Sequence, residues 1–173
     1  WNVNNFLKVN KCEFNKKINP KKLSLNINKW IYSELINTKN SAEKHIKDYR
    51  FDEATRTIYK FVWNSYCDWY LELSKTILFS KNKKHIKEVK ATSGLIFKEI
   101  LILLHPFIPF ITEELWLKNK LGNKKEKYLM YANWIKDNKG QKDKEVTDVK
   151  QVIDVISKIR SFKNELSVSP GSF

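Results

Sequence analysis

Glycine and proline are scarce in this chain of 173 residues, which contains four of each. Because these residues end helices and form turns, their scarcity favours long helices over many short strands. Two cysteines, Cys12 and Cys67, are too few for a disulfide framework or a cysteine metal site, so we expect a reducing, cytoplasmic setting. No apolar run approaches the roughly 20 residues needed to cross a bilayer, and we expect no membrane partner.

Acidic residues and arginines are also few. The chain has 33 lysines and arginines against 19 aspartates and glutamates, a formal net charge of +14, yet only three of the basic residues are arginines. This charge favours a polyanionic partner, most often nucleic acid, although abundant Lys, Asn and Ile are also typical of an AT-rich genome. Since the planar guanidinium binds phosphates and bases better than an ammonium does, Arg50, Arg56 and Arg160 are more informative than any lysine.

Motifs for catalysis or metal binding are missing from the sequence. No histidine has a His or Cys partner one helical turn away, as a zinc site would require. The glycines are isolated, so there is no glycine-rich phosphate loop. Asp68 and Glu72 share a helix face, but we expect them to hold the bundle together through hydrogen bonds. We therefore predict no catalytic residue, no metal and no cofactor in this chain, and a function in binding.

Hydrophobic periodicity predicts an all-α fold, a bundle of four to five helices. We predict a domain of residues 1–135, followed over residues 136–173 by a charged linker and a final helix that begins a C-terminal subdomain truncated at residue 173. Since the chain begins at Trp1 instead of a methionine, we expect a piece of a longer polypeptide. The predicted helices cover residues 1–9, 26–48, 51–80, a stretch ending at 104, a short stretch from about 113 to 120 and 147–166, with a short extended segment near 129–134.

Residues 61–75, FVWNSYCDWYLELSK, contain five aromatic residues among the first ten. The period of a helix places part of them on one apolar stripe, which we expect to be buried. Tyr59 and Trp63 lie on another face, and the pattern leaves open whether they pack against a helix or contact bases. The residues assigned to the structural core are Tyr66, Trp69, Leu73, Pro106 and Pro109.

Three segments, in order, resemble the anticodon-binding domain of class I aminoacyl-tRNA synthetases. RFDEATRTIYKFVWNSYCDWYLELSK (50–75) resembles its central helix, and HPFIPFITEELW (105–116) is similar to its proline-bent junction. VISKIRSFKNELSVSPG (155–171) resembles the helix that follows. Within the first segment, DWYLELSK is most similar to the valyl form, although the isoleucyl and leucyl enzymes share the bundle. The resemblance covers nearly the whole chain.

This resemblance implies a helical domain that recognises the anticodon stem-loop of a valine tRNA. It also implies a cytoplasmic, monomeric parent ligase, in which the catalytic domain of the same polypeptide uses ATP and Mg to attach valine to the tRNA. The chain by itself would then be inactive. The alternatives are the isoleucyl or leucyl counterpart, and a helical protein-interaction module that has no role with RNA and no salt-sensitive RNA binding.

The residue types that read RNA loops guide the choice of candidates. Loop bases stack on aromatic rings and guanidinium planes, and phosphates pair with basic side chains. Phe51 and Arg50 stand together at a predicted helix start, where both could meet a loop base, unless Phe51 only packs on the helix end and Arg50 is solvated. The RNA-binding candidates are Arg50, Phe51, Arg56, Lys60, Arg160 and Lys163.

Overall fold

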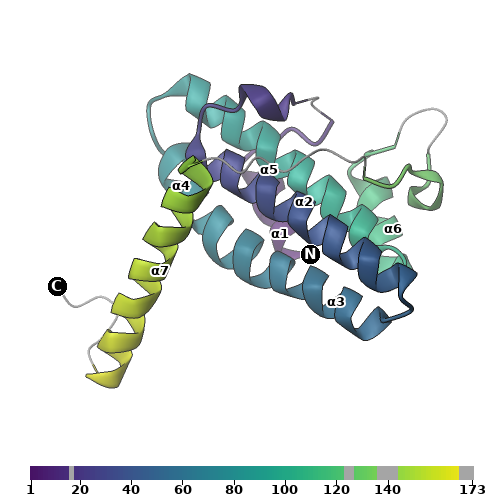
Figure 1. The fold of residues 1–173 in the computed structure, drawn as a ribbon. Coiled ribbons are helices and arrows are strands. Elements are labelled where there is room, and N and C mark those ends of the chain that lie inside the picture. Colours follow the sequence, from purple (N-terminus) through teal and green to yellow (C-terminus); the bar gives the residue numbers. More distant parts are fainter. Residues whose placement is uncertain (16–17, 123–126, 136–143, 168–173) are drawn as a thin grey trace.

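The computed structural model describes residues 1–15, 18–122, 127–135 and 144–167, which form six helical rods and no strand (Figure 1). The all-α prediction is confirmed, and the six rods correspond to the six predicted helical stretches, where the bundle itself was expected to contain four to five helices. Residues 51–78 form one uninterrupted rod, in which a π-helix joins two α-helices. The elements are α1 (Asn2–Val9), η1 (Pro20–Lys22), α2 (Asn26–Lys47), α3 (Phe51–Lys60), η2 (Phe61–Leu71), α4 (Glu72–Leu78), α5 (Lys83–Leu104), α6 (Pro109–Lys118), η3 (Leu129–Tyr131) and α7 (Lys144–Glu165).

Helix α2 lies at the centre of the bundle and packs against α3, η2, α5 and α7. One cluster of buried side chains includes residues of α1, α2, the 51–78 rod, α5, α6 and α7. Helix α7 leaves the bundle at an angle (Figure 1): Val146 and Val149 near its beginning are buried, whereas Ile159 and Leu166 near its end are exposed. In the described part of the chain, no helix is both long and apolar enough to cross a bilayer.

Three predicted boundaries are wrong. Helix α6 begins at Pro109 instead of near residue 113, because the fixed φ of proline suits the first position of a helix. Helix α7 begins at Lys144, so Thr147 lies inside it and does not cap it. The segment near 129–134 was predicted as extended; it contains a 3-10 turn, η3, between extended residues Tyr128 and Ala132. Most of the predicted charged linker, residues 136–143, lies outside the described residues, and the division of the chain at 135 stays a prediction.

The π-helix η2 shifts which aromatic residues face the core. A π-helix bonds residue i to residue i+5, so its buried positions recur at wider spacing than in an α-helix. The core residues of the rod accordingly step from Phe61 to Tyr66 and then to Tyr70. Trp69 and Leu73, predicted as core from a 3.6-residue period, are only half-buried. Trp69 lies in η2 and packs against the core from its half-buried position, whereas Leu73 lies beyond η2, on α4.

Hydrogen bonds satisfy the two buried tyrosines of η2. The Tyr66 hydroxyl donates to the Ser93 carbonyl oxygen at 2.8 Å, and the Tyr70 hydroxyl donates to Asn28 Oδ1 at 2.8 Å. Burial raises the pKa of both hydroxyls, so both stay protonated as donors at neutral pH. The expectation that Asp68 holds the bundle together through buried hydrogen bonds is wrong, since its side chain is exposed. Glu72 is exposed as well and pairs with Lys75 on the same rod.

Glu88 of α5 fixes the beginning of α2. Its carboxylate accepts hydrogen bonds from the backbone of Ser24 at 3.1 Å, the backbone of Leu25 at 2.9 Å and Asn28 Nδ2 at 2.9 Å. Burial by itself would raise the pKa of this carboxyl, but the hydrogen bonds outweigh it and the pKa lies below its ordinary value. The ionised form is therefore stabilised by folding.

Replacing this carboxylate should change the acid side of the stability profile. We expect Glu88→Gln to lower the free energy of unfolding at neutral pH by about 1–2 kcal/mol, because an amide oxygen accepts more weakly than a carboxylate and its NH₂ faces other donors. Since the folded pKa is depressed, this stabilisation is present above the unfolded pKa and is lost as the pH falls through the folded pKa. Urea titrations at pH 7 and pH 3 measure this: the difference between the two proteins should be smaller at pH 3 than at pH 7. An equal difference at both pH values would contradict the assignment.

Candidate nucleic-acid interface

The turn between α2 and α3 exposes two aromatic rings. Tyr49 ends α2 with a positive φ of 58°, and the Arg50 backbone N–H bonds back to the His45 carbonyl at 2.8 Å. This is the hydrogen-bond pattern that commonly ends helices at a left-handed residue, although a glycine is usual there. The Tyr49 ring is 82% exposed and the Phe51 ring 51% exposed, and they meet edge to face at 6.4 Å between centroids.

Two guanidinium groups flank these rings. Arg50 Nη2 and Arg56 Nη1 each lie 3.7 Å from the same Glu53 carboxylate oxygen, and both arginine side chains are exposed. Such exposed pairs contribute little to stability, so either guanidinium can leave for a stronger anionic partner. Lys60 follows Arg56 by one turn on α3 and is exposed. We call Tyr49, Arg50, Phe51, Arg56 and Lys60 the turn surface.

A cavity of about 570 Å³ opens beside the turn surface, and we call it the turn cavity. Phe51 lines one side of it, and the turn between α5 and α6 lines the other through Pro106 and Phe107. Glu43 and Lys47 of α2 supply charge at its wall; hydrogen bonds from Lys39 and Lys47 hold the pKa of the Glu43 carboxyl below its ordinary value. Two chain reversals thus meet at one end of the bundle and enclose an apolar space.

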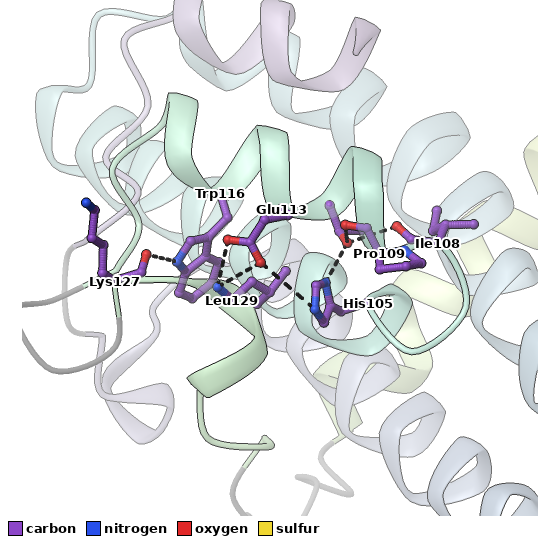
Figure 2. Close-up of polar contacts among 8 residues, drawn as sticks. His105, Ile108, Pro109, Glu113, Trp116, Lys127 and Leu129 are labelled. Carbon is purple, nitrogen blue, oxygen red and sulfur yellow. Dashed lines mark hydrogen bonds and ion pairs between the residues drawn. The ribbon is translucent and has the colours of Figure 1, made fainter.

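The α5–α6 reversal is fixed by polar contacts (Figure 2). His105 Nδ1 lies 2.8 Å from Thr112 Oγ1, and the single hydroxyl proton of Thr112 is shared between the Ile108 and Pro109 carbonyls, at 2.9 and 3.0 Å. Pro106 and Pro109 are exposed, so the prediction that they belong to the core is wrong. Both prolines act through the backbone. Pro106 cannot continue the helix that ends at Leu104, and Pro109 suits the first position of the next helix.

Helix α6 also holds the segment that follows it (Figure 2). The Glu113 carboxylate accepts from the Leu129 backbone N–H at 3.0 and 3.2 Å, and the Trp116 indole N–H donates to the Lys127 carbonyl at 3.2 Å. His105 Nε2 lies 4.0 Å from the same Glu113 carboxylate. These contacts place Trp134, a few residues further on, at the wall of the turn cavity.

The candidates on α7 lie elsewhere. The guanidinium carbon of Arg160 sits 5.0 Å from the centroid of the Trp69 ring, a cation–π contact that joins α7 to η2. Phe51 and Trp69 lie on one rod 18 positions apart, which corresponds to roughly 25 Å. The structure therefore brings Arg50, Phe51, Arg56 and Lys60 together and leaves Arg160 with Lys163 as a second, separate group.

Tyr49 and Trp134 are parts of this region that sequence reasoning missed. Tyr49 stands directly before the Arg50–Phe51 pair, so an aromatic residue at a helix break was an available signal. Trp134 reaches the turn cavity only through the tertiary contacts of α6, and no local pattern indicates that. Among the described residues, no cluster of three His, Cys, Asp or Glu side chains could hold a metal ion.

Comparison with known proteins identifies the fold. The profile of the family described as "Anticodon-binding domain of tRNA ligase" matches residues 28–172. The chain belongs to the anticodon-binding domain family of tRNA ligases. The family match begins two residues inside α2 and includes the whole 51–78 rod and α5, and therefore every residue of the turn surface.

Relatives of this anticodon-binding domain are much longer proteins. The valine–tRNA ligase of Pelagibacter ubique is 59% identical over 173 residues, which is 100% of this chain and 20% of that protein. The valine–tRNA ligases of Zymomonas mobilis and Rhizobium meliloti are each 38% identical, over 98% and 99% of the chain. The chain spans about a fifth of the length of these curated relatives.

Proposed function

We propose that this anticodon-binding domain is part of a valine–tRNA ligase and that its turn surface binds the anticodon loop of valine tRNA. The observation that carries the proposal is a pair of exposed rings, Tyr49 and Phe51, at the same turn as two exposed guanidinium groups, Arg50 and Arg56, that share the Glu53 carboxylate. Splayed loop bases stack on such rings, and loop phosphates pair with such cations. The names of the relatives above support valine as the amino acid.

In the longer polypeptide, a separate catalytic domain would use ATP and Mg to attach valine, and this chain would hold the tRNA without taking part in that chemistry. We propose a monomeric, cytoplasmic enzyme. Arg160 and Lys163 stay candidates for phosphate contacts, at a place distinct from the turn surface. In that role Arg160 would bind RNA with a guanidinium already oriented by the Trp69 ring.

Removing the Phe51 ring is the direct test of this proposal. Stacking of one base on an aromatic ring contributes about 1–3 kcal/mol, so Phe51→Ala should weaken binding of the valine anticodon stem-loop by roughly 5- to 150-fold. Fluorescence anisotropy with a labelled stem-loop measures the change. Phe79→Ala is the matched control, because Phe79 is another exposed phenylalanine, 82% exposed, at the opposite end of the same rod. The control should bind as the parent does.

The same titrations separate the alternatives. Binding should fall with salt, with a slope of about −0.7 for each single-strand phosphate contacted, and a stem-loop with changed anticodon bases should bind more weakly. Equal binding of both loops, or an equal loss in Phe51→Ala and Phe79→Ala, would exclude anticodon recognition at the turn surface. A preference for an isoleucine or leucine loop would reassign the ligase. No salt-sensitive binding to any loop would favour a protein-interaction module.

A further inference from the structure

A second cavity, of about 650 Å³, lies between α2, α5 and the segment that precedes residue 136. Its wall is largely aromatic and aliphatic, and its charged members are Lys98 and Glu99 of α5. The volume lies within the range of pockets that hold small organic ligands, roughly 300–1,000 Å³. We call it the Glu99 cavity; its principal lining residues are Tyr32, Ile36, Glu99, Ile102, Trp116 and Trp134.

Glu99 differs from the other carboxylates that line the interior. Glu88 and Glu113 accept hydrogen bonds from backbone N–H groups, and Glu43 pairs with two lysines. Glu99 is half-buried, and within the described ranges its carboxylate has no hydrogen-bond or ion-pair partner. Burial raises its pKa to about 7, against the opposing effect of the Lys98 charge. The carboxylate is partly shielded from water and has no protein donor, so it can accept a hydrogen bond from a ligand in the cavity.

The neighbouring lysine does not satisfy this carboxylate. Lys98 Nζ donates to the Leu121 carbonyl at 3.1 Å and lies 5.1 Å from the centroid of the Trp116 ring. The lysine is thus directed to the α6 side of the cavity. The Glu99 carboxylate therefore remains available as a hydrogen-bond acceptor beside the aromatic residues that line the cavity.

Trp134 connects this cavity to the turn cavity, because it is a lining residue of both. Phe51, the proposed stacking residue, lines the turn cavity. An RNA strand that places one base on Phe51 in the turn cavity can therefore reach the neighbouring Glu99 cavity with another base. The occupant of the Glu99 cavity is then most simply a nucleobase of the same loop.

We propose that the Glu99 cavity takes one nucleobase of the bound RNA, a base whose amino group donates to the Glu99 carboxylate while its faces pack against the aromatic walls. This inference rests on the proposed function. Cytosine, adenine and guanine carry an amino donor, and a Glu or Asp carboxylate is a known acceptor for the N4 amino group of cytosine. Uracil has no amino group, and the two carbonyl oxygens that flank its single N3–H donor are repelled by the carboxylate, so it is selected against.

The experiment combines base analogues with variants of Glu99 in the full polypeptide that carries this chain. Stem-loops are made in which each amino-bearing loop base is replaced in turn by its analogue without the amino group, and their affinities are measured by anisotropy. At one loop position, the deletion should weaken binding to the parent protein about tenfold. In Glu99→Ala the same deletion should cost nothing, because the acceptor is already gone. Glu114→Ala is the matched control, since Glu114 is an exposed glutamate on α6 outside the cavity lining.

The outcomes are distinguishable. At pH 8, above the raised pKa of Glu99, both alanine variants remove close to one negative charge, so any general gain in RNA affinity is shared, and only a position-specific loss in Glu99→Ala supports the site. Thermal melting should show Glu99→Ala at least as stable as the parent, because the substitution removes an unpartnered carboxylate. Equal amino-group effects in all three proteins would overturn this inference and leave the proposed function intact. Absence of loop-specific binding in the parent protein would overturn both.

Discussion

Replacing Trp116 by alanine is expected to lower the free energy of unfolding by about 3–5 kcal/mol, the usual cost of emptying a large buried aromatic site. The Trp116 side chain is only 1% exposed and belongs to the common core. It also donates to the Lys127 carbonyl and lies under the Lys98 ammonium group, so the substitution removes polar contacts as well as apolar ones. Urea unfolding followed by circular dichroism at neutral pH measures the change.

Trp116→Phe separates the two contributions. Phenylalanine retains most of the buried area but has no N–H, so the Lys127 carbonyl loses its donor and the loss should be about 1–2 kcal/mol. A loss below about 1 kcal/mol in Trp116→Ala would show that the α5–α6 end of the bundle does not depend on this side chain. Because Trp116 lines the Glu99 cavity, its substitution should also weaken RNA binding wherever Glu99→Ala does.

The long helices could be predicted from the sequence because their apolar stripes repeat regularly and because their ends carry local signals. The break after α2 and the end of α5 before Pro106 are examples. The π-helix could not be predicted, because no sequence pattern in residues 61–71 indicates that the backbone hydrogen bonds change from i+4 to i+5 spacing. Within this element Phe61, Tyr66, Tyr70 and Leu71 are buried, and Trp69 packs against the core from a half-buried position.

For the candidate RNA-binding residues, too, the sequence predicted what depends on local position and not what depends on packing. Arg50 and Phe51 were identified from sequence because their place at a helix start is a local property. Their grouping with Tyr49 at one end, and the separation of Arg160 from them, depend on how the rods pack. Glu99 could not be identified from the sequence, because a glutamate on an apolar helix usually occupies a solvated position. Only the structure shows that it lines a cavity and has no protein partner in the described part of the chain.

Gly94 is the position where local and tertiary rules disagree most. A glycine inside a helix costs about 1 kcal/mol relative to alanine, so helix propensity predicts that alanine would stabilise α5. The loop after α1 crosses α5 at this position: the Glu13 backbone N–H bonds to the Lys90 carbonyl at 3.4 Å, and the Phe14 ring packs on Phe97 at 5.9 Å. A Cβ on Gly94 would overlap the Glu13 carbonyl oxygen and lie 2.8 Å from its carbon.

We therefore expect Gly94→Ala to destabilise the protein by about 2–3 kcal/mol, the cost of overpacking exceeding the gain in helix propensity. The contact atoms belong to backbone, so no side-chain rotation relieves the overlap and the crossing loop itself must move. Urea unfolding measures the loss, and Lys87→Ala on the exposed face of α5 is the control, expected within about 0.5 kcal/mol of the parent. An increase in stability would show that the loop after α1 is not held against α5, and that helix propensity alone decides this position.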